Sequence, residues 1–202
     1  MFPLTLSGEM AKNICHVALI VLLLCHAACG QRATPHMSGS PNSPAPVPST
    51  LLKTDLKALA EATAEALLRK DFNTVADFTY HKVVKLMGGR DETVSAIGQE
   101  MTKAERKGIT LVSVTVGEPK EVKKFGKQLF SIVPTTLNMK VRDGTMVAQS
   151  FMIAVSEDGG KNWTFVDGAI AVDKTTLREL FPYAANKLQL PPKKQPVIYP
   201  ND

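Results

Sequence analysis

Cysteine is scarce in this chain of 202 residues and is absent after Cys29. The three cysteines, Cys15, Cys25 and Cys29, all lie close to the N-terminus. The rest of the chain therefore has no thiol for catalysis, no cysteine ligand for a metal and no internal disulfide. The cysteines point to processing of the N-terminus and not to the chemistry of a folded domain.

Histidine is also rare, with four in the whole chain, and beyond residue 30 only His36 and His81 remain. No HxH or HExxH pattern and no carboxylate cluster has the spacing of metal ligands. The patterns GxGxxG, GxxxxGKS/T and GxSxG are missing too. These absences exclude the common metal, nucleotide and hydrolase sites, and we predict neither a metal nor a cofactor.

Charge of one sign is not concentrated in this chain, whose formal net charge is +5. That excess is too small for the basic stripe of a nucleic-acid-binding protein, so we predict no nucleic-acid partner. The hydrophobic share of 44% is ordinary for a globular protein. Residues 51–182 suit a single domain.

The longest apolar run, residues 14–28, is shorter than the roughly 20 residues that a bilayer-spanning helix needs. It ends in small residues, and this pattern predicts a secretory signal peptide over residues 1–28. Met10 is an alternative start, because it places Lys12 ahead of the apolar run. The protein is thus expected to be exported.

The residues Ala27-Ala28-Cys29-Gly30 resemble a bacterial lipobox. The resemblance implies cleavage before Cys29, acylation of its thiol, and a lipid anchor in a membrane of the cell envelope. Soluble export to the periplasm or the medium, with cleavage after Ala28 or Gly30, is the alternative, and an uncleaved anchor is the third. The stretch 29–50 is rich in proline and serine, so we predict a disordered tether.

The spacing of hydrophobic residues along the chain changes once, at Gly108, from a helical to a strand pattern. Before it, Leu52, Leu56, Leu59, Thr63 and Leu67 share one face of a predicted helix. Asp71 is placed to cap a second helix through Tyr80, and Asp91 a third that ends before Gly108.

After Gly108 the period becomes two, which predicts strands over 112–116, 128–141, 145–156 and 163–166. Hairpins are expected around residues 125–126, at Asp143-Gly144 and over 157–162. Pro134 predicts a bulge or bend, because proline removes a ladder hydrogen bond. A closing helix over 173–181 and an extended tail over 183–202 complete the chain.

Three helices followed by a strongly bent antiparallel sheet make an α+β domain. In element order, and in the break GGRDE over residues 88–92, it resembles the nuclear-transport-factor-2-like superfamily, which includes ketosteroid isomerase and SnoaL-like cyclases. The resemblance implies a cone-shaped fold that encloses a cavity. Some members catalyse in that cavity, and many bind ligands or dimerise through the sheet. Fold alone does not choose among these roles.

Isomerase-like chemistry needs a carboxylate base and an oxyanion donor such as tyrosine. The weak candidates are Asp77, Tyr80 and His81, which could share one helix face, while Asp71 is expected only to cap. The alternative reading is that Asp77 is solvated and that Tyr80 packs in the core. If the domain binds a ligand, Tyr80, Met139, Met152 and Trp163 are the weak candidates for contact.

Two further motifs are read as structural. SEDGGKNW, residues 156–163, fits the Asp-box pattern, in which Asp158 accepts main-chain N–H groups and Trp163 packs beneath the turn. PKEVKKFGKQ, residues 119–128, has four lysines, typical of a solvated hairpin edge. Contact with anionic lipid headgroups is its alternative role.

The sequence thus predicts an exported, lipid-anchored protein whose domain binds and does not catalyse. Its partner would be a small apolar ligand or another protein, and a homodimer is also compatible. The alternatives are a small-molecule isomerase or cyclase and a purely structural dimerisation module.

Overall fold

The computed structural model describes residues 49–171 and 173–201, with side chains from Asp55 onward. The predicted signal peptide, Cys29 and nearly all of the predicted tether lie outside the described residues. Within them, none of the helices is long and apolar enough to cross a membrane.

Four helices precede the sheet in the described part of the chain: α2 (Ser49–Leu68), α3 (Phe72–Phe78), α4 (His81–Leu86) and α5 (Arg90–Arg106). Asp71 caps α3 as predicted, because its Oδ1 accepts the N–H of Thr74 at 3.2 Å. The cap predicted at Asp91 was wrong: Gly89, whose φ is 122°, occupies the N-cap of α5, and Asp91 lies in the first turn.

The helix predicted from Asp71 to Tyr80 is present as α3, but it ends at Phe78 and not at Tyr80. Thr79 adopts an extended conformation and forms a parallel bridge with Phe165. The N–H of Tyr80 donates to the carbonyl of Phe165 at 2.9 Å. Pairing with a distant strand therefore interrupts the helix, so Asp77 and Tyr80 do not share a helix face.

The six strands are all antiparallel: β1 (Thr110–Val116), β2 (Lys123–Phe125), β3 (Gln128–Val141), β4 (Gly144–Ser156), β5 (Thr164–Asp167) and β6 (Val197–Pro200). Their order is β1-β3-β4-β5, with β2 paired to β3 and β6 paired to β4. The domain is thus α+β with an open antiparallel sheet. Two short helices, α6 (Gly168–Ala171) and α7 (Lys174–Leu180), follow β5.

Pro134 does not cause the predicted bulge in β3. The β3–β4 ladder runs without interruption from Leu129↔Ser156 to Val141↔Gly144. The nitrogen of Pro134, which has no hydrogen to donate, faces the edge of β3 away from β4, between the end of β1 and the start of β2. On that edge the carbonyl of Pro134 accepts the N–H of Gly117 at 2.8 Å. The irregular pairing is in β1, between Leu111 and Ser113.

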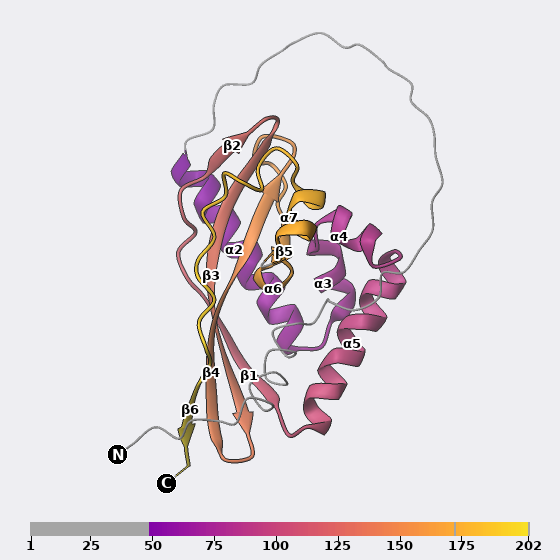
Figure 1. Ribbon diagram of the computed structural model, residues 1–202, viewed down its shortest axis with the longest axis vertical. Helices are drawn as coiled ribbons and strands as arrows, with labels where there is room; N and C mark the ends of the chain where they lie inside the picture. The colour runs from indigo at the N-terminus through magenta and orange to yellow at the C-terminus, as the bar shows by residue number, and fades with distance from the viewer. Residues whose placement is uncertain (1–48, 172, 202) are drawn as a thin grey trace.

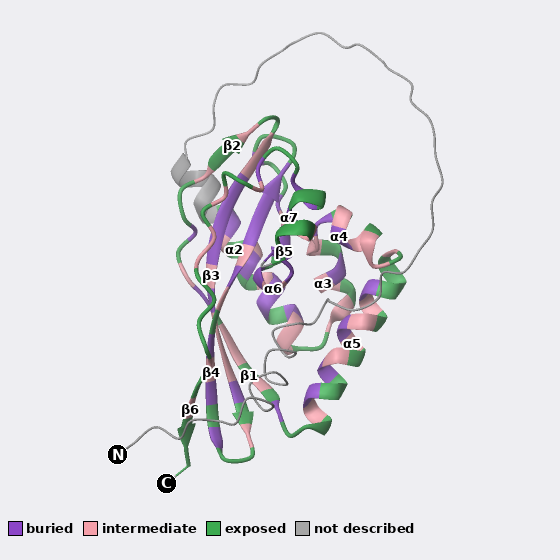
Figure 2. Cartoon of the chain, in the orientation of Figure 1, coloured by how far each residue is buried: buried purple, intermediate pink, exposed green. Residues whose placement is uncertain are grey.

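Much of β3 and β4 is buried (Figure 2), and apolar clusters pack on both sides of the sheet. On one side Leu56, Ala60 and Ala64 of α2 pack with Val133 and Phe165. On the other a cluster joins the sheet to α4 and α7; it includes Tyr80, Val83, Phe130, Ile153, Leu177 and Phe181. After α7 the chain returns along β3 and β4 and ends in β6 (Figure 1).

Candidate functional site

The hydroxyl of Tyr80 is held in a small polar cluster. Tyr80 is fully buried, and its ring stacks on Phe181 with the ring centroids 5.2 Å apart. Its hydroxyl donates to Glu157 Oε1 at 3.2 Å and accepts from Gln128 Nε2 at 3.0 Å. Gln128 also donates to Glu157 at 2.7 Å. Both partners come from hairpins of the sheet, which the local pattern around Tyr80 could not reveal.

The cluster brings together two of the three predicted catalytic candidates. Nδ1 of the exposed His81 lies 3.6 Å from Glu157 Oε2. Burial, together with the nearby charge of Glu157, raises the pKa of Tyr80 to about 12, although the hydrogen bond from Gln128 opposes the shift. Tyr80 therefore keeps its proton at neutral pH. Its hydroxyl already donates one hydrogen bond and accepts another within the protein.

Asp77 is separate from this cluster. Its carboxylate accepts two hydrogen bonds from Arg90, from Nε at 2.7 Å and from Nη2 at 3.1 Å. The hydrogen bond from Arg90 holds the pKa of Asp77 below its usual value. An ionised carboxylate bound to a guanidinium is a weak base, so Asp77 is poorly suited to abstract a proton. Its ion pair with Arg90 instead holds the start of α5 against α3.

The Asp-box turn has the geometry that the sequence predicts. Asp158 Oδ1 accepts the N–H groups of Lys161 and Asn162 at 3.1 and 3.0 Å, and Trp163 is buried beside α2. Burial alone would raise the pKa of Asp158, but hydrogen bonds from Asn162, Ser156 and Lys161 outweigh it and lower the pKa to about 2. The motif builds the turn between β4 and β5.

We expect Asp158→Ala to lower the free energy of unfolding by about 1–3 kcal/mol at neutral pH, because the turn N–H groups lose a charged acceptor. The pKa of Asp158 is lower in the folded chain than in the unfolded chain, where it is about 4. The stabilisation is thus present above pH 4 and lost as the pH falls toward 2. Denaturant unfolding between pH 2 and pH 7 measures both effects. An equal loss in the exposed control Glu121→Ala would contradict this account.

The sheet has a notch at one edge of β4. On that edge β5 pairs with residues 152–155 of β4, and β6 pairs with residues 144–147. Residues 148–151 between them pair with neither strand. The C-terminal segment 191–196 passes this gap just before it enters β6.

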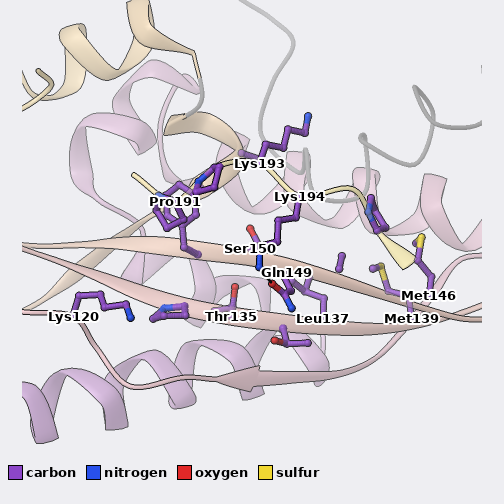
Figure 3. Close-up of a pocket in the computed structure, with 18 residues that line it drawn as sticks. Lys120, Thr135, Leu137, Met139, Met146, Gln149, Ser150, Pro191, Lys193 and Lys194 are labelled. Carbon is purple, nitrogen blue, oxygen red and sulfur yellow. Dashed lines mark hydrogen bonds between the residues drawn. The ribbon is translucent and has the colours of Figure 1, made fainter. Parts of the chain in front are cut away.

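A groove of about 430 Å³ extends from the notch over β4 and β3 as far as Lys120 (Figure 3). The four residues of β4 that pair with neither β5 nor β6 line it, together with residues of β3, the start of α6 and the C-terminal segment. The apolar lining residues are Pro134, Leu137, Met139, Met146, Ala148, Phe151, Gly168, Ala169, Pro191, Pro192 and Pro196. The polar ones are Lys120, Thr135, Thr136, Gln149, Ser150, Lys193 and Lys194. This volume lies within the usual range for small-molecule sites, about 300–1,000 Å³.

The C-terminal segment that forms one wall is held at two places. Lys194 Nζ donates to Gln149 Oε1 at 2.7 Å, and β6 holds the segment at the following residues. A second cavity of about 360 Å³ lies along the same segment, between residues 188–191 and strands β2 and β3. It shares Lys120 and Pro191 with the groove.

Only one of the residues predicted to contact a ligand reaches this groove. Met139 lines it and is also buried in a core cluster with Ala104 and Ile109, whereas Met152, Trp163 and Tyr80 line neither cavity and pack in the other two core clusters. Lys120 belongs to the predicted lysine-rich hairpin. Lys193 and Lys194 were overlooked because they lie in a segment that reads as a plain extended tail.

No family model, curated protein or solved structure matches the chain. Across the described residues, no three histidine, cysteine or acidic side chains are grouped so that they could hold a metal ion.

Proposed function

We propose that this chain is an exported, lipid-anchored protein of the cell envelope whose domain binds a small molecule in the groove at the β4 notch. The groove itself is the observation that supports a binding role. It is mostly apolar, has a few polar groups at defined positions, and is bounded by segments far apart in the sequence. Sites that bind small ligands have this character.

The polar cluster favours binding over catalysis as the role of the domain. An isomerase or cyclase would need Tyr80 or His81 to face a substrate beside a basic carboxylate. Tyr80 is fully buried, its hydroxyl has two protein partners, and Asp77 is paired with Arg90. These groups stabilise the junction of α3, α4 and the sheet.

The anchor part of the proposal rests on the sequence. The lipobox-like residues Ala27 to Gly30 and the proline-rich stretch that follows would hold the domain at a short distance from a membrane. The resemblance to the nuclear-transport-factor-2-like superfamily is kept as a proposal for the fold. The order of the elements, helices first and long antiparallel strands afterwards, supports it.

A structural dimerisation role is the second candidate. Val112 of β1 and Val197 and Tyr199 of β6 are large apolar residues with half or more of their surface exposed: 60%, 50% and 57%. Exposed apolar side chains on edge strands are candidate contacts for a second copy.

Mass spectrometry of the protein purified from membranes tests the proposal. The denatured spectrum should show a chain that begins at Cys29 and carries acyl groups. The native spectrum should show an additional small molecule that is lost on denaturation. An unacylated chain contradicts the anchor. A native mass equal to that of the chain or its dimer contradicts ligand binding and favours the dimerisation module.

A further inference from the structure

The polar lining of the groove carries charge of one sign. Three lysines, Lys120, Lys193 and Lys194, line it, and no acidic residue does. None of the three has a carboxylate within ion-pair distance among the residues that the structure describes. The site therefore has cationic donors and no anionic partner of its own.

Main-chain groups of β4 also face the notch. The carbonyl of Pro134 points toward Gly117, away from β4, so Pro134 and its partner Phe151 do not bond to each other. Phe151 must then direct its N–H and C=O groups away from β3, toward the edge of β4 where β5 and β6 pair. Gln149 does the same, because residues two apart in a strand direct these groups to the same edge. The carbonyl of Phe151 indeed faces Gly168, at 2.6 Å from the position of a Cβ there. The N–H of Gln149 is thus directed into the gap between β5 and β6.

The groove is polarised along its length. Figure 3 shows Lys120 and Pro191 toward one end and Met139 and Met146 toward the other. The side chain of Lys120 extends toward Thr135, and Lys194 reaches Gln149, while Lys193 extends away from the strands. Met139 and Met146 are 3% and 0% exposed, so an apolar chain contacts them when their adaptable side chains shift.

We propose that the groove binds an amphipathic anion, a carboxylate or phosphate head on a linear apolar chain. The head contacts Lys194 and the N–H of Gln149, Lys120 adds positive charge at the end of the groove away from the methionines, and the chain runs toward Met139 and Met146. This inference rests on the proposed binding function and names the chemical class of its ligand. Such molecules, free fatty acids or single-chain phosphates, are also the amphiphiles that a domain tethered to a membrane would meet.

Calorimetric titration of the full chain with four probes of equal chain length tests this inference. The probes are dodecanoate, dodecyl phosphate, dodecanol and dodecyltrimethylammonium. We expect one or both anions to bind at least about tenfold more tightly than dodecanol, the equivalent of one well-placed ionic contact. The cation should bind most weakly. The stronger of the two anions identifies the head group.

Two triple variants with the same loss of charge separate the site from general electrostatic attraction. Replacing Lys120, Lys193 and Lys194 by Gln should remove the preference for the anion, so that dodecanol and both anions bind this variant with equal affinity. Replacing the exposed Lys107, Lys161 and Lys174 by Gln should leave the preference intact. Equal binding of dodecanol and both anions to the unmodified chain would overturn this inference alone. Failure of all four probes to bind would overturn the proposed binding function as well.

Discussion

Tyr80→Ala is expected to lower the free energy of unfolding by about 3–5 kcal/mol, the cost of removing a large aromatic side chain from a core. Tyr80 is 0% exposed and packs on Phe181, which in turn meets Phe130 with ring centroids 5.2 Å apart. Tyr80 also joins the α3–α4 junction to β5, so a cavity there loosens two elements at once. Urea unfolding followed by circular dichroism measures the change.

Two comparisons make this prediction specific. Tyr80→Phe keeps the ring and should cost only about 1 kcal/mol, because Gln128 and Glu157 still bond to each other. Tyr183→Ala removes a tyrosine that is 79% exposed and should be almost neutral. Equal losses for Tyr80→Ala and Tyr183→Ala would show that Tyr80 is not in the core.

Gly144→Ala is expected to detach β6 and open one wall of the groove. Gly144 has φ 153°, and a Cβ at this residue would lie 2.0 Å from the carbonyl oxygen of Tyr199. Neither backbone can accommodate that contact, so the variant should lose about 1–3 kcal/mol from backbone strain and also lose the β4–β6 ladder. Hydrogen exchange of residues 197–199 should then approach that of an unpaired strand.

Gly126→Ala is the matched control for this effect. Gly126 also has a positive φ of 64°, but a Cβ there meets nothing within 4 Å. It should share the conformational strain and leave exchange at β6 unchanged. Retained protection of residues 197–199 in Gly144→Ala would contradict the close packing of β6 on β4.

Local pattern predicted the elements whose cause is local. The switch of period at Gly108 separates helices from strands, and the limits expected for β3 are those of the structure, residues 128–141. Asp71 and Asp158 were placed correctly because a cap and a turn depend on neighbouring residues only. Periodicity and turn chemistry act over a few residues, which is why these predictions hold.

The features that local sequence patterns did not predict depend on pairing between segments far apart in the chain. The helix over 71–80 breaks because Thr79 pairs with Phe165 of β5. The tail forms β6 because Val197 to Pro200 meet residues 144–147, and the β-favouring triplet Val-Ile-Tyr was the only local signal. The groove follows from both β5 and β6 being too short to cover β4, a property of the assembled sheet.

The central claim, that the groove at the β4 notch holds a small molecule, is tested most directly by filling it. Thr136 lines the groove from β3 and is half-buried, so Thr136→Trp would occupy its space without changing the core. Native mass spectra should show a bound molecule on the unmodified chain and on Thr110→Trp, whose site is exposed at the start of β1. The same molecule should be missing from Thr136→Trp. A bound molecule that persists in Thr136→Trp would place the binding site elsewhere and contradict the account.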